Sequence, residues 1–350
     1  MKTLEKILEN LEINSWVRNF SRSPHQFNKP HETDAELIEI EGNDSQLLAV
    51  TIDSVAEEIN EGFYQDPFTM GWVTVMANFS DLSAVGADPL GIVISVSVEP
   101  TRSEAFRQGI AQGMEAACRK LEVFILGGDT NTTRTISLTG CAIGVVTKEK
   151  KMTRIGCQSG DVIFLSGRAG SGSAIGLARL ANLPEEYFSE SCYRPTARIK
   201  EGQLIRNYAT CCMDTSDGVI HTLDQLMRLN NLQFILNDNW DEIINSIALK
   251  ICQAQNIPPW LMLAGLHGEF ELCFTIRPQD RADFLEAAEQ MEWNPIQIGE
   301  VREGDGVKIK SQGRLIEIDT ALIRNLAQTA GQDSRSYAKS LIDYAMKVGI

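Results

Sequence analysis

The sequence predicts an α+β to α/β protein that folds as two domains of similar size. Its 350 residues exceed what one hydrophobic core usually serves, so two domains are expected. Strand and helix signals alternate up to about Val146, and a second alternating series starts at Asp161. The segment between them, TKEKKMTRIGCQSGD, is polar and contains glycines, which is typical of a linker. We therefore divide the chain into domains 1–150 and 151–350.

The first half combines five expected strands with three expected helices. MKTLEKILENLEI has apolar residues at the spacing of an amphipathic helix, and AELIEIEG and LLAVTID form a hairpin around a turn at 42–44. An apolar face predicts a helix over 70–88, and the alternation in GIVISVSV predicts a strand over 91–98. Ser103 is the expected N-cap of a helix ending near Lys120. VFIL and ISLTGCAIGVV are further strands, separated by a turn at GGDT.

The second half opens with the strand DVIFLSG, a glycine-rich turn and the helix SGSAIGLARLA. A helix near 197–208 follows, and ATCCMDTSDG leads into the helix VIHTLDQLMRLN. ELCFTI predicts a strand, DRADFLEAAEQM a helix, and IQIGEVREGDGVKI a pair of short strands. Two amphipathic helices are expected between 320 and 350.

The charge balance excludes several classes of partner. The chain has 32 Lys and Arg against 47 Asp and Glu, a net charge of −15. It lacks the Lys/Arg cluster that binding to nucleic acid or to an anionic membrane surface would need. If so acidic a protein binds a phosphorylated ligand, a divalent metal is expected between the two negative partners.

Hydropathy and cysteine usage favour a cytoplasmic location. No apolar run approaches the ~18 residues of a membrane span, and the N-terminal segment lacks the continuous apolar core of a signal peptide. The eight cysteines are scattered, without a CxxC pair or a His/Cys metal spacing. Reduced, buried thiols are therefore expected.

Aspartates recur where an apolar strand or helix meets a turn of small residues. They are Asp44, Asp53, Asp81, Asp129, Asp214 and Asp217. Mg²⁺ prefers oxygen ligands and usually keeps waters, so one or two carboxylates per ion suffice. Aspartate in such a place is also typical of an N-cap or an Asx-turn, and spacing alone leaves both interpretations open. A metal–phosphate site requires that these aspartates converge in the folded chain.

Other chemical signals are weaker. SGRAGSGSAIG follows a strand and opens a helix, where backbone amides can bind phosphate, but it lacks the Lys-Ser/Thr of a P-loop. A structural tight turn is the preferred interpretation. His267 precedes a strand and is expected to be a turn residue. G-x-S-x-G, HExxH and kinase catalytic-loop patterns do not occur, so a nucleophilic Ser or Cys has no support.

The order of the motifs resembles the thiamine-monophosphate kinases of the aminoimidazole-ribonucleotide-synthetase-like superfamily. From about residue 40 to 308, the segments that carry the resemblance are GNDSQLL, TIDSVAEE, GWVTVMANFSDLSAVGADPL, GGDT, SGDVIFLSG, MDTSDGVIHTLDQL, GEFELCFT and IGEV. The resemblance implies an N-terminal sheet domain that forms a homodimer and binds ATP and Mg²⁺, and a C-terminal α/β domain that closes over the second substrate. The implied reaction transfers the γ-phosphoryl group of ATP to thiamine monophosphate, a small phosphorylated metabolite.

Carried over to this sequence, the resemblance implies a set of site residues. The implied metal ligands are Asp44, Asp53, Asp81, Asp129 and Asp217. Of these, Asp129 and Asp217 are also implied to act in catalysis. The implied nucleotide contacts are Thr51, Gly127, Gly128, Thr130 and Arg134.

The departures from the family's pattern concentrate on the acceptor side. Asn43 replaces the first acid of GDD, EINEGF replaces GVHF, LHGEFEL replaces GGEDYEL, and GGDTNTTRT displaces Arg134. Use of ATP and Mg²⁺ is therefore better supported than the identity of the acceptor. Two alternatives stay open: an ATP-dependent synthetase of the same superfamily, which would release free phosphate, and a nucleotide-binding protein without activity.

Overall fold

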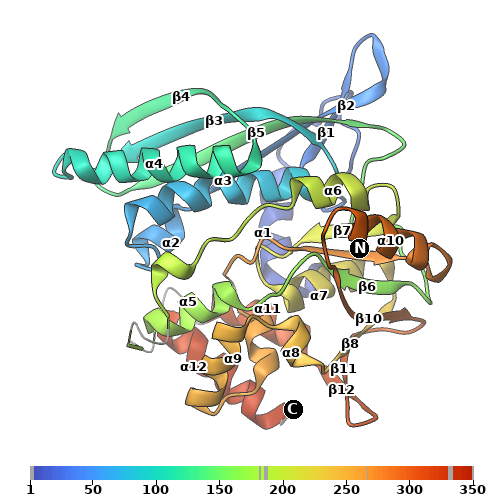
Figure 1. Ribbon diagram of the computed structural model, residues 1–350. Coiled ribbons are helices and arrows are strands. Elements are labelled where there is room, and N and C mark those ends of the chain that lie inside the picture. Colours follow the sequence, from blue (N-terminus) through green and yellow to red (C-terminus); the bar gives the residue numbers. More distant parts are fainter. Residues whose placement is uncertain (1–3, 181–182, 185–187, 266, 330–333, 349–350) are drawn as a thin grey trace.

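The computed structural model describes residues 4–180, 183–184, 188–265, 267–329 and 334–348. Within them, two β-sheets are arranged one above the other, with helices between and around them (Figure 1). The strands of the first sheet come from residues 36–147 and those of the second from residues 162–318. The predicted linker falls between the two sheets, and the domain limits at residue 150 stay a prediction.

The first sheet has the strand order β1-β2-β5-β3-β4. Its strands are β1 (Glu36–Ile40), β2 (Asn43–Ser54), β3 (Asp88–Val98), β4 (Ile125–Thr132) and β5 (Ser137–Thr147). Neighbours pair antiparallel except β3 and β4, which are parallel and are joined by the crossover helix α4 (Glu104–Leu121). The predicted hairpin and strands are confirmed, but GGDT lies inside β4 and is not a turn.

Helix α3 (Pro67–Ala84) covers one face of this sheet, and α4 packs against α3 (Figure 1). Gly140 of β5 permits the close approach, because a Cβ there would lie 2.5 Å from Nδ2 of Asn78. Along β2 the side chains alternate, so Ala49 is buried under α3 while Ile52 is 69% exposed on the opposite side. We call that opposite side the outer face of the sheet.

The two long helices of the first half begin at capped ends. Asp66 accepts a hydrogen bond from the Phe68 N–H (3.1 Å) at the start of α3, which begins before the predicted residue 70. It ends at Ala84, not at residue 88, because Gly86 adopts a left-handed conformation (φ 71°). The predicted N-cap of α4 is confirmed, since Ser103 accepts from the Phe106 N–H at 3.2 Å.

The second sheet has the strand order β12-β11-β8-β10-β6-β9-β7. Its strands are β6 (Val162–Leu165), β7 (Ala209–Asp214), β8 (Gln233–Asn237), β9 (Leu272–Ile276), β10 (Ile296–Arg302), β11 (Val307–Ser311) and β12 (Arg314–Ile318). The helices of this half are α5 (Ser171–Leu180), α6 (Ile199–Ile205), α7 (Val219–Asn230), α8 (Trp240–Ile243), α9 (Ser246–Gln255), α10 (Arg281–Gln290), α11 (Thr320–Thr329) and α12 (Ser334–Val348). The predicted elements are present, whereas β7, β8, β12, α8 and α9 were not expected. Among the described helices, none is long and apolar enough to cross a bilayer.

Short helical segments complete the fold. They are η1 (Leu4–Lys6), α1 (Leu8–Val17), α2 (Ala56–Asn60), η2 (Glu190–Cys192), η3 (Pro259–Leu263) and η4 (Pro278–Asp280). The N-terminal ones pack on the second half of the chain, since η1 contacts α7 and α1 contacts α11. The expected N-terminal helix is therefore present from Leu8, after the short helix η1, and residues 1–3 of the prediction lie outside the described residues.

A buried network joins this N-terminal helix to the second half. Arg324 of α11 donates to Oδ2 of Asp224 (3.0 Å), to Oε1 of Gln225 (2.7 Å) and to Oε2 of Glu9 (2.8 Å). Asp224 is fully buried and also binds Arg228 at 2.8 Å. Because every charge has a partner of opposite sign, removal of one member would leave a costly unpaired charge in the core.

We expect Gly113→Ala to destabilise the fold by about 1–3 kcal/mol, because the interior cannot expand to accept another methyl group. A Cβ at Gly113 would lie 2.0 Å from the carbonyl oxygen of Phe68, and one at Gly71 would lie 2.0 Å from that of Ile110. Urea unfolding measures the change. Gln112→Ala, at the exposed neighbouring position of the same helix, should change stability by less than about 0.5 kcal/mol. Equal effects of the two substitutions would contradict the close α3–α4 packing.

Candidate active site

Three carboxylates that are distant in the sequence meet near the C-terminal end of α3. Asp34 lies just before β1, Asp81 is in the last turn of α3, and Asp214 ends β7. One carboxylate oxygen of each lies within 4.8 Å of the others. The cluster therefore joins the first sheet, the long helix and the second sheet at one point.

Hydrogen bonds fix each member of this cluster. Asp81 accepts from the Thr51 hydroxyl of β2. Asp214 accepts from the hydroxyls of Ser80 (2.7 Å) and Ser216 (3.0 Å). Since Ser80 belongs to α3 and Asp214 to β7, the first of these bonds connects the two halves of the molecule. Asp34 pairs with Arg154 at 2.9 Å, as described below.

Asp53 is held beside the cluster by its own backbone. Asn78 of α3 accepts from the Asp53 N–H at 3.0 Å and donates to the Asp53 carbonyl at 3.3 Å. These two bonds anchor the end of β2 to α3, so that the Asp53 side chain lies near Asp81.

Burial of several like charges raises the pKa of most of these carboxyl groups. Burial, and next the charge of Asp214, raises the pKa of Asp53 to about 7. Burial, and next the charge of Asp34, raises the pKa of Asp214 to about 7. Burial and the charges of Asp53 and Asp214 hold the pKa of Asp81 well above its usual range. The cluster is thus a place where negative charge is strongly disfavoured until a cation balances it.

The residues present fit a divalent cation. The Asp34 side chain is only 1% exposed, and its Oδ2 atom has no hydrogen-bond partner among the described residues. Its other oxygen accepts from Arg154, a side chain 17% exposed, whose Nε atom is buried and also lacks a partner in the described part of the chain. One guanidinium cannot balance three or four carboxylates, and converging carboxylate oxygens are the ligands that Mg²⁺ prefers.

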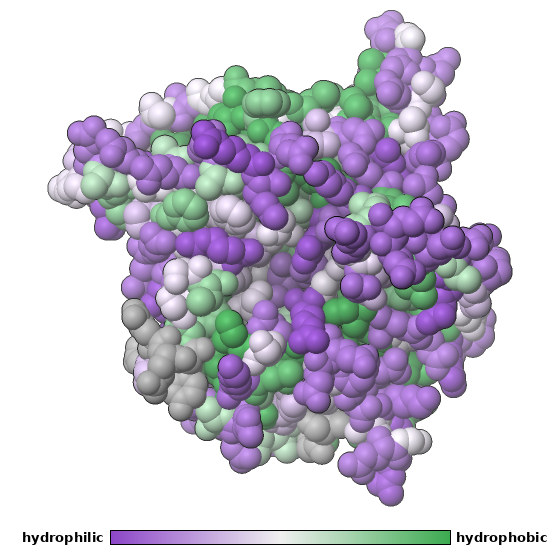
Figure 2. Space-filling view, viewed as in Figure 1, coloured by the Kyte–Doolittle hydropathy of each residue, from purple (hydrophilic) through white to green (hydrophobic). Residues whose placement is uncertain are grey.

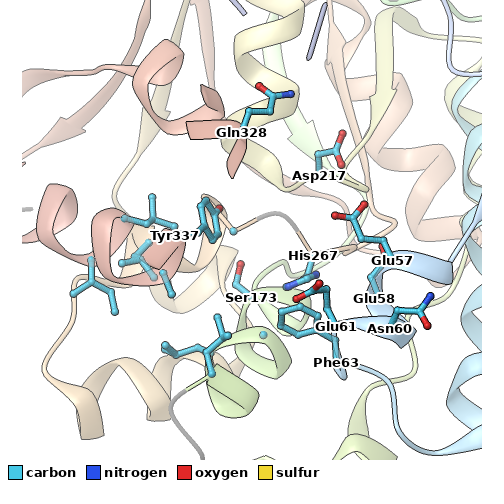
Figure 3. A pocket seen from close by; sticks show the side chains of 18 of the residues that line it. Glu57, Glu58, Asn60, Glu61, Phe63, Ser173, Asp217, His267, Gln328 and Tyr337 are labelled. Atoms are coloured by element: carbon cyan, nitrogen blue, oxygen red, sulfur yellow. The ribbon is translucent and has the colours of Figure 1, made fainter. Parts of the chain in front are cut away.

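A cavity of about 930 Å³ opens between the two halves of the chain. Asp217, in the turn before α7, lines it, and burial together with the charge of Glu9 raises the pKa of Asp217 to about 6. Figure 3 shows the glutamates of α2 along one side of the cavity and Tyr337 of α12 on the opposite side. His267 lies between them, beside Phe63. The cavity can therefore receive a small molecule whose one end reaches Asp217.

The structure does not bring Asp44 to this site. Asp44 begins β2, next to the β1–β2 turn, and Asp53 is near the end of the same strand. Nine residues of extended chain separate the two, a span of about 30 Å. Within one chain Asp44 is therefore apart from the other aspartates, and its assignment as a metal ligand stays a prediction. The residue that joins the cluster from this part of the sequence is Asp34.

Asp129 is also apart from the cluster within this chain. Asp129 of β4 pairs with Ser95 of β3, which pairs with Thr139 of β5. Thr139 in turn pairs with Ser54 of β2. Because Ser54 follows Asp53 and successive side chains alternate, Asp129 is on the outer face and Asp53 on the inner one. Three strand spacings add a separation of about 14 Å. Asp129 is exposed, and its carboxylate accepts from Nδ2 of Asn131 at 2.6 Å.

The residues predicted to contact the nucleotide lie in two places, one at the aspartate cluster and one on and beyond β4. Thr51 binds Asp81 in the cluster. Gly127, Gly128 and Thr130 are exposed on β4, and Arg134 lines a second, open cavity beyond the end of that strand. Gly128 is required by packing, because a Cβ would lie 1.9 Å from the carbonyl oxygen of Ile94. Contact of these β4 residues with a nucleotide stays a prediction.

The glycine-rich turn before α5 already holds an anion from its own chain. Glu269 is buried, and its carboxylate accepts from the Ser171 N–H (3.0 Å), the Ser171 hydroxyl (2.9 Å) and the Gly172 N–H (2.9 Å). These are the groups that would bind a phosphate at a helix N-terminus. The structural interpretation of this turn is therefore supported.

Sequence reasoning missed three residues of the cluster. Asp214 was among the candidate aspartates but was not assigned a role, and Asp34 and Arg154 were not considered. Asp34 offered the same signal as the others, an acid immediately before a strand. Arg154 is one basic residue within the polar linker, and the sequence carries no sign that it folds back onto Asp34.

The chain is similar to proteins of known family and known structure. Residues 32–146 match the family model of the AIR synthase related protein, N-terminal domain. The thiamine-monophosphate kinase of Buchnera aphidicola subsp. Acyrthosiphon pisum is 31% identical over 69% of this chain and 75% of its own. That of Pyrococcus horikoshii is 30% identical over 78% and 84%. Among solved structures, AaThiL complexed with AMPPCP and TMP has the same fold, with a TM-score of 0.70, 23% identity, and coverage of 90% of this chain and 96% of that one.

We expect the metal-free protein to become more stable as the pH falls from 8 to 6.5. The unfolded carboxyl groups titrate near pH 4, so in this range carboxyl groups take up protons only in the folded state, where their pKa values are raised, and that uptake favours folding. Burial lowers the pKa of His221 to about 3 and that of His267 to about 4, so proton uptake by these histidines in the unfolded state offsets part of the effect, equally in the wild type and in the variants. Urea unfolding in EDTA measures the effect. Asp81→Asn should reduce the pH dependence and be more stable than the wild type at pH 8. Asp44→Asn should retain the wild-type dependence, and an unchanged dependence in Asp81→Asn would contradict the charge repulsion.

Proposed function

This chain belongs to the thiamine-monophosphate kinase family, and we propose on that premise that it transfers the γ-phosphoryl group of ATP to the phosphate of thiamine monophosphate. The observation that carries the proposal is the cavity between the two halves, whose wall contains Asp217, a carboxyl group that interacts electrostatically with Asp53 and Arg154 of the cluster region. An ATP-dependent kinase needs such a place, where two phosphorylated substrates meet beside groups that can hold a metal.

We infer that Asp34, Asp81 and Asp214 would hold Mg²⁺, with Asp53 and Asp217 at adjacent positions. The bound metal would supply charge neutralisation for the phosphates of both substrates. Thr51, Ser80 and Asn78 keep the acids or their backbone in place before any ligand arrives. Arg154, held by Asp34, is placed to donate to a phosphate oxygen through its unpartnered Nε. Positioning and charge therefore dominate, and a general base has a minor role because the attacking group is itself an anionic phosphate.

We also propose that the protein is a homodimer that pairs through the outer face of the first sheet. Three apolar pairs lie side by side there: Leu48–Val145, Val50–Ile143 and Ile52–Cys141. Phe124 and Leu126 add exposed side chains beside them. Figure 2 shows hydrophobic residues along the top of the molecule, over the strands of this sheet. A contiguous apolar surface of this kind is typical of a protein–protein interface. A cytoplasmic location stays a prediction.

The proposal predicts that the purified protein converts thiamine monophosphate and ATP into thiamine diphosphate and ADP only when Mg²⁺ is present. Asp34→Asn should lower the rate by about a hundredfold or more, because several kcal/mol of charge stabilisation depend on the metal ligands. Asp44→Asn should keep a rate near that of the wild type. Chromatographic measurement of the product tests both. Free phosphate in place of the diphosphate would indicate a synthetase, and loss of activity in Asp44→Asn would restore Asp44 to the site.

The dimer proposal predicts that Ile52→Glu yields a monomer, since a buried charge in an apolar interface is strongly unfavourable. Light scattering coupled to size-exclusion chromatography measures the mass. Leu315→Glu serves as the control, because Leu315 is also an exposed apolar strand residue (46%) but belongs to β12 of the second sheet. A monomeric wild type, or a dimeric Ile52→Glu variant, would exclude pairing through the outer face.

A further inference from the structure

The turn that carries Asp214 and Asp217 is fastened to the chain just before β9. Thr215, the residue after Asp214, is fully buried. Its N–H and its hydroxyl both donate to the Glu271 carbonyl, at 2.9 and 3.0 Å, and its hydroxyl oxygen accepts from the Glu271 N–H at 3.2 Å. Its carbonyl accepts from the Glu269 N–H at 3.4 Å. Every polar group of Thr215 is therefore bonded to one short segment.

The Glu271 side chain is itself held by a buried ion pair. Its carboxylate is 8% exposed and accepts from Nε of Arg198 at 2.8 Å and from Nη2 of the same guanidinium. The carboxylate also accepts from the Ser166 hydroxyl at 2.5 Å, and that hydroxyl oxygen accepts from the Leu272 N–H at 2.7 Å. A Cβ at Gly167 would lie 2.7 Å from both carboxylate oxygens, so glycine at this position leaves room for the pair. Residues at the end of β6 and at the start of α6 therefore fix the position of Glu271.

The backbone next to Glu271 is strained. Phe270 is buried and adopts a left-handed conformation (φ 55°), which is unfavourable for a bulky residue. Such conformations persist only where the surrounding structure enforces them, and they cluster at functional sites. Here the bonds of Glu269 to the start of α5 and of Glu271 to Arg198 hold the chain on both sides of Phe270.

Stability alone does not account for an ion pair in this place. Apolar side chains of similar volume would often stabilise a core as well as a buried pair or better. The turn that the pair supports, however, must hold Asp214 against the repulsion of Asp34. The Ser80 hydroxyl fixes the Asp214 side chain from α3, and Thr215 fixes its backbone from the second half of the chain. The pair therefore supports a turn that electrostatic repulsion would otherwise displace.

We propose that Glu271 and Arg198 are positioning residues for phosphoryl transfer. They act through Thr215, which keeps Asp214 and Asp217 where a metal–phosphate complex can bind. This inference rests on the proposed kinase function and adds residues that do not line the cavity. Their effect on the rate comes from placement, because a shift of about 1 Å in a reacting group can lower a rate by up to about a hundredfold.

The first test measures kcat, and the Mg²⁺ concentration that gives half the maximal rate, for Glu271→Gln. We expect kcat to fall about tenfold or more and the required Mg²⁺ concentration to rise, because Asp214 is no longer held in place. Glu201→Gln is the matched control. Glu201 pairs with the same arginine, at 3.3 Å, but no hydrogen bond in the described part of the chain links it to the turn. Equal effects of the two substitutions would contradict the proposal.

Substitutions of Thr215 separate positioning from folding. Thr215→Val keeps the shape of the side chain but lacks the hydroxyl, so it should show the same loss of rate and the same raised Mg²⁺ requirement as Glu271→Gln. Thr215→Ser keeps the hydroxyl and should recover most of the rate. A purely structural defect would lower the amount of active enzyme without changing the Mg²⁺ requirement. Circular dichroism identifies the folded variants, and either Glu271→Gln or Thr215→Val suffices for the test.

Calorimetry with Mg²⁺ alone keeps this inference separate from the kinase proposal. If the wild type makes thiamine diphosphate but the variants have its kcat and its Mg²⁺ requirement, the inference fails alone. If the wild type makes no diphosphate, the metal titration decides. Binding of Mg²⁺ that is about tenfold weaker in Thr215→Val than in the wild type would support the inference without the kinase. Equal affinity, or no binding by the wild type, would overturn it.

Discussion

Mutual repulsion among buried carboxylates is the constraint around which this molecule is organised. Asp34, Asp81 and Asp214 place oxygens within 4.8 Å of one another at the end of α3, with Asp53 beside them. Folding must hold these groups together against their charges and against the loss of hydration. Packing elsewhere supplies the necessary stability. A bound cation would attract all of these carboxylates and so outweigh their mutual repulsion. Such a site is unfavourable in the empty protein because it is preorganised for its ligands.

Helix α3 is the element that makes this arrangement possible. It packs on β2 and β5 of the first sheet, and it also contacts α6, β7 and β9 of the second half. Ser80 on this helix binds Asp214, Asn78 holds the end of β2, and Asp81 is itself a member of the cluster. Glycines at Gly140 and Gly113 allow the sheet and α4 to approach the helix closely. A shift of α3 would therefore move acids from both halves at once.

The sequence was informative wherever a local pattern determines the structure. The alternation in GIVISVSV predicted β3, Ser103 predicted the start of α4, and the polar segment after Val146 separates the two sheets. Local patterns could not give long-range register. The place of Asp129 on the outer face follows from the pairing of four strands, and GGDT looks like a turn although it continues β4. Matching GND to an acidic motif selected Asp44, while Asp34 reaches the cluster because β1 runs antiparallel to β2.

The bond between the first and last parts of the chain has a consequence for how the two halves could evolve. Glu9 and Asn10 contact Arg324 and Gln225, so a helix encoded at the start of the sequence completes the core of the second half. An exchange of the first 150 residues with those of a relative would transfer this helix as well, and would expose Asp224, Arg228 and Arg324 to a foreign neighbour. Recombination between family members is therefore expected to succeed more often when only the segment between the N-terminal helix and the linker is exchanged, because such an exchange leaves the buried ion network with its original partners.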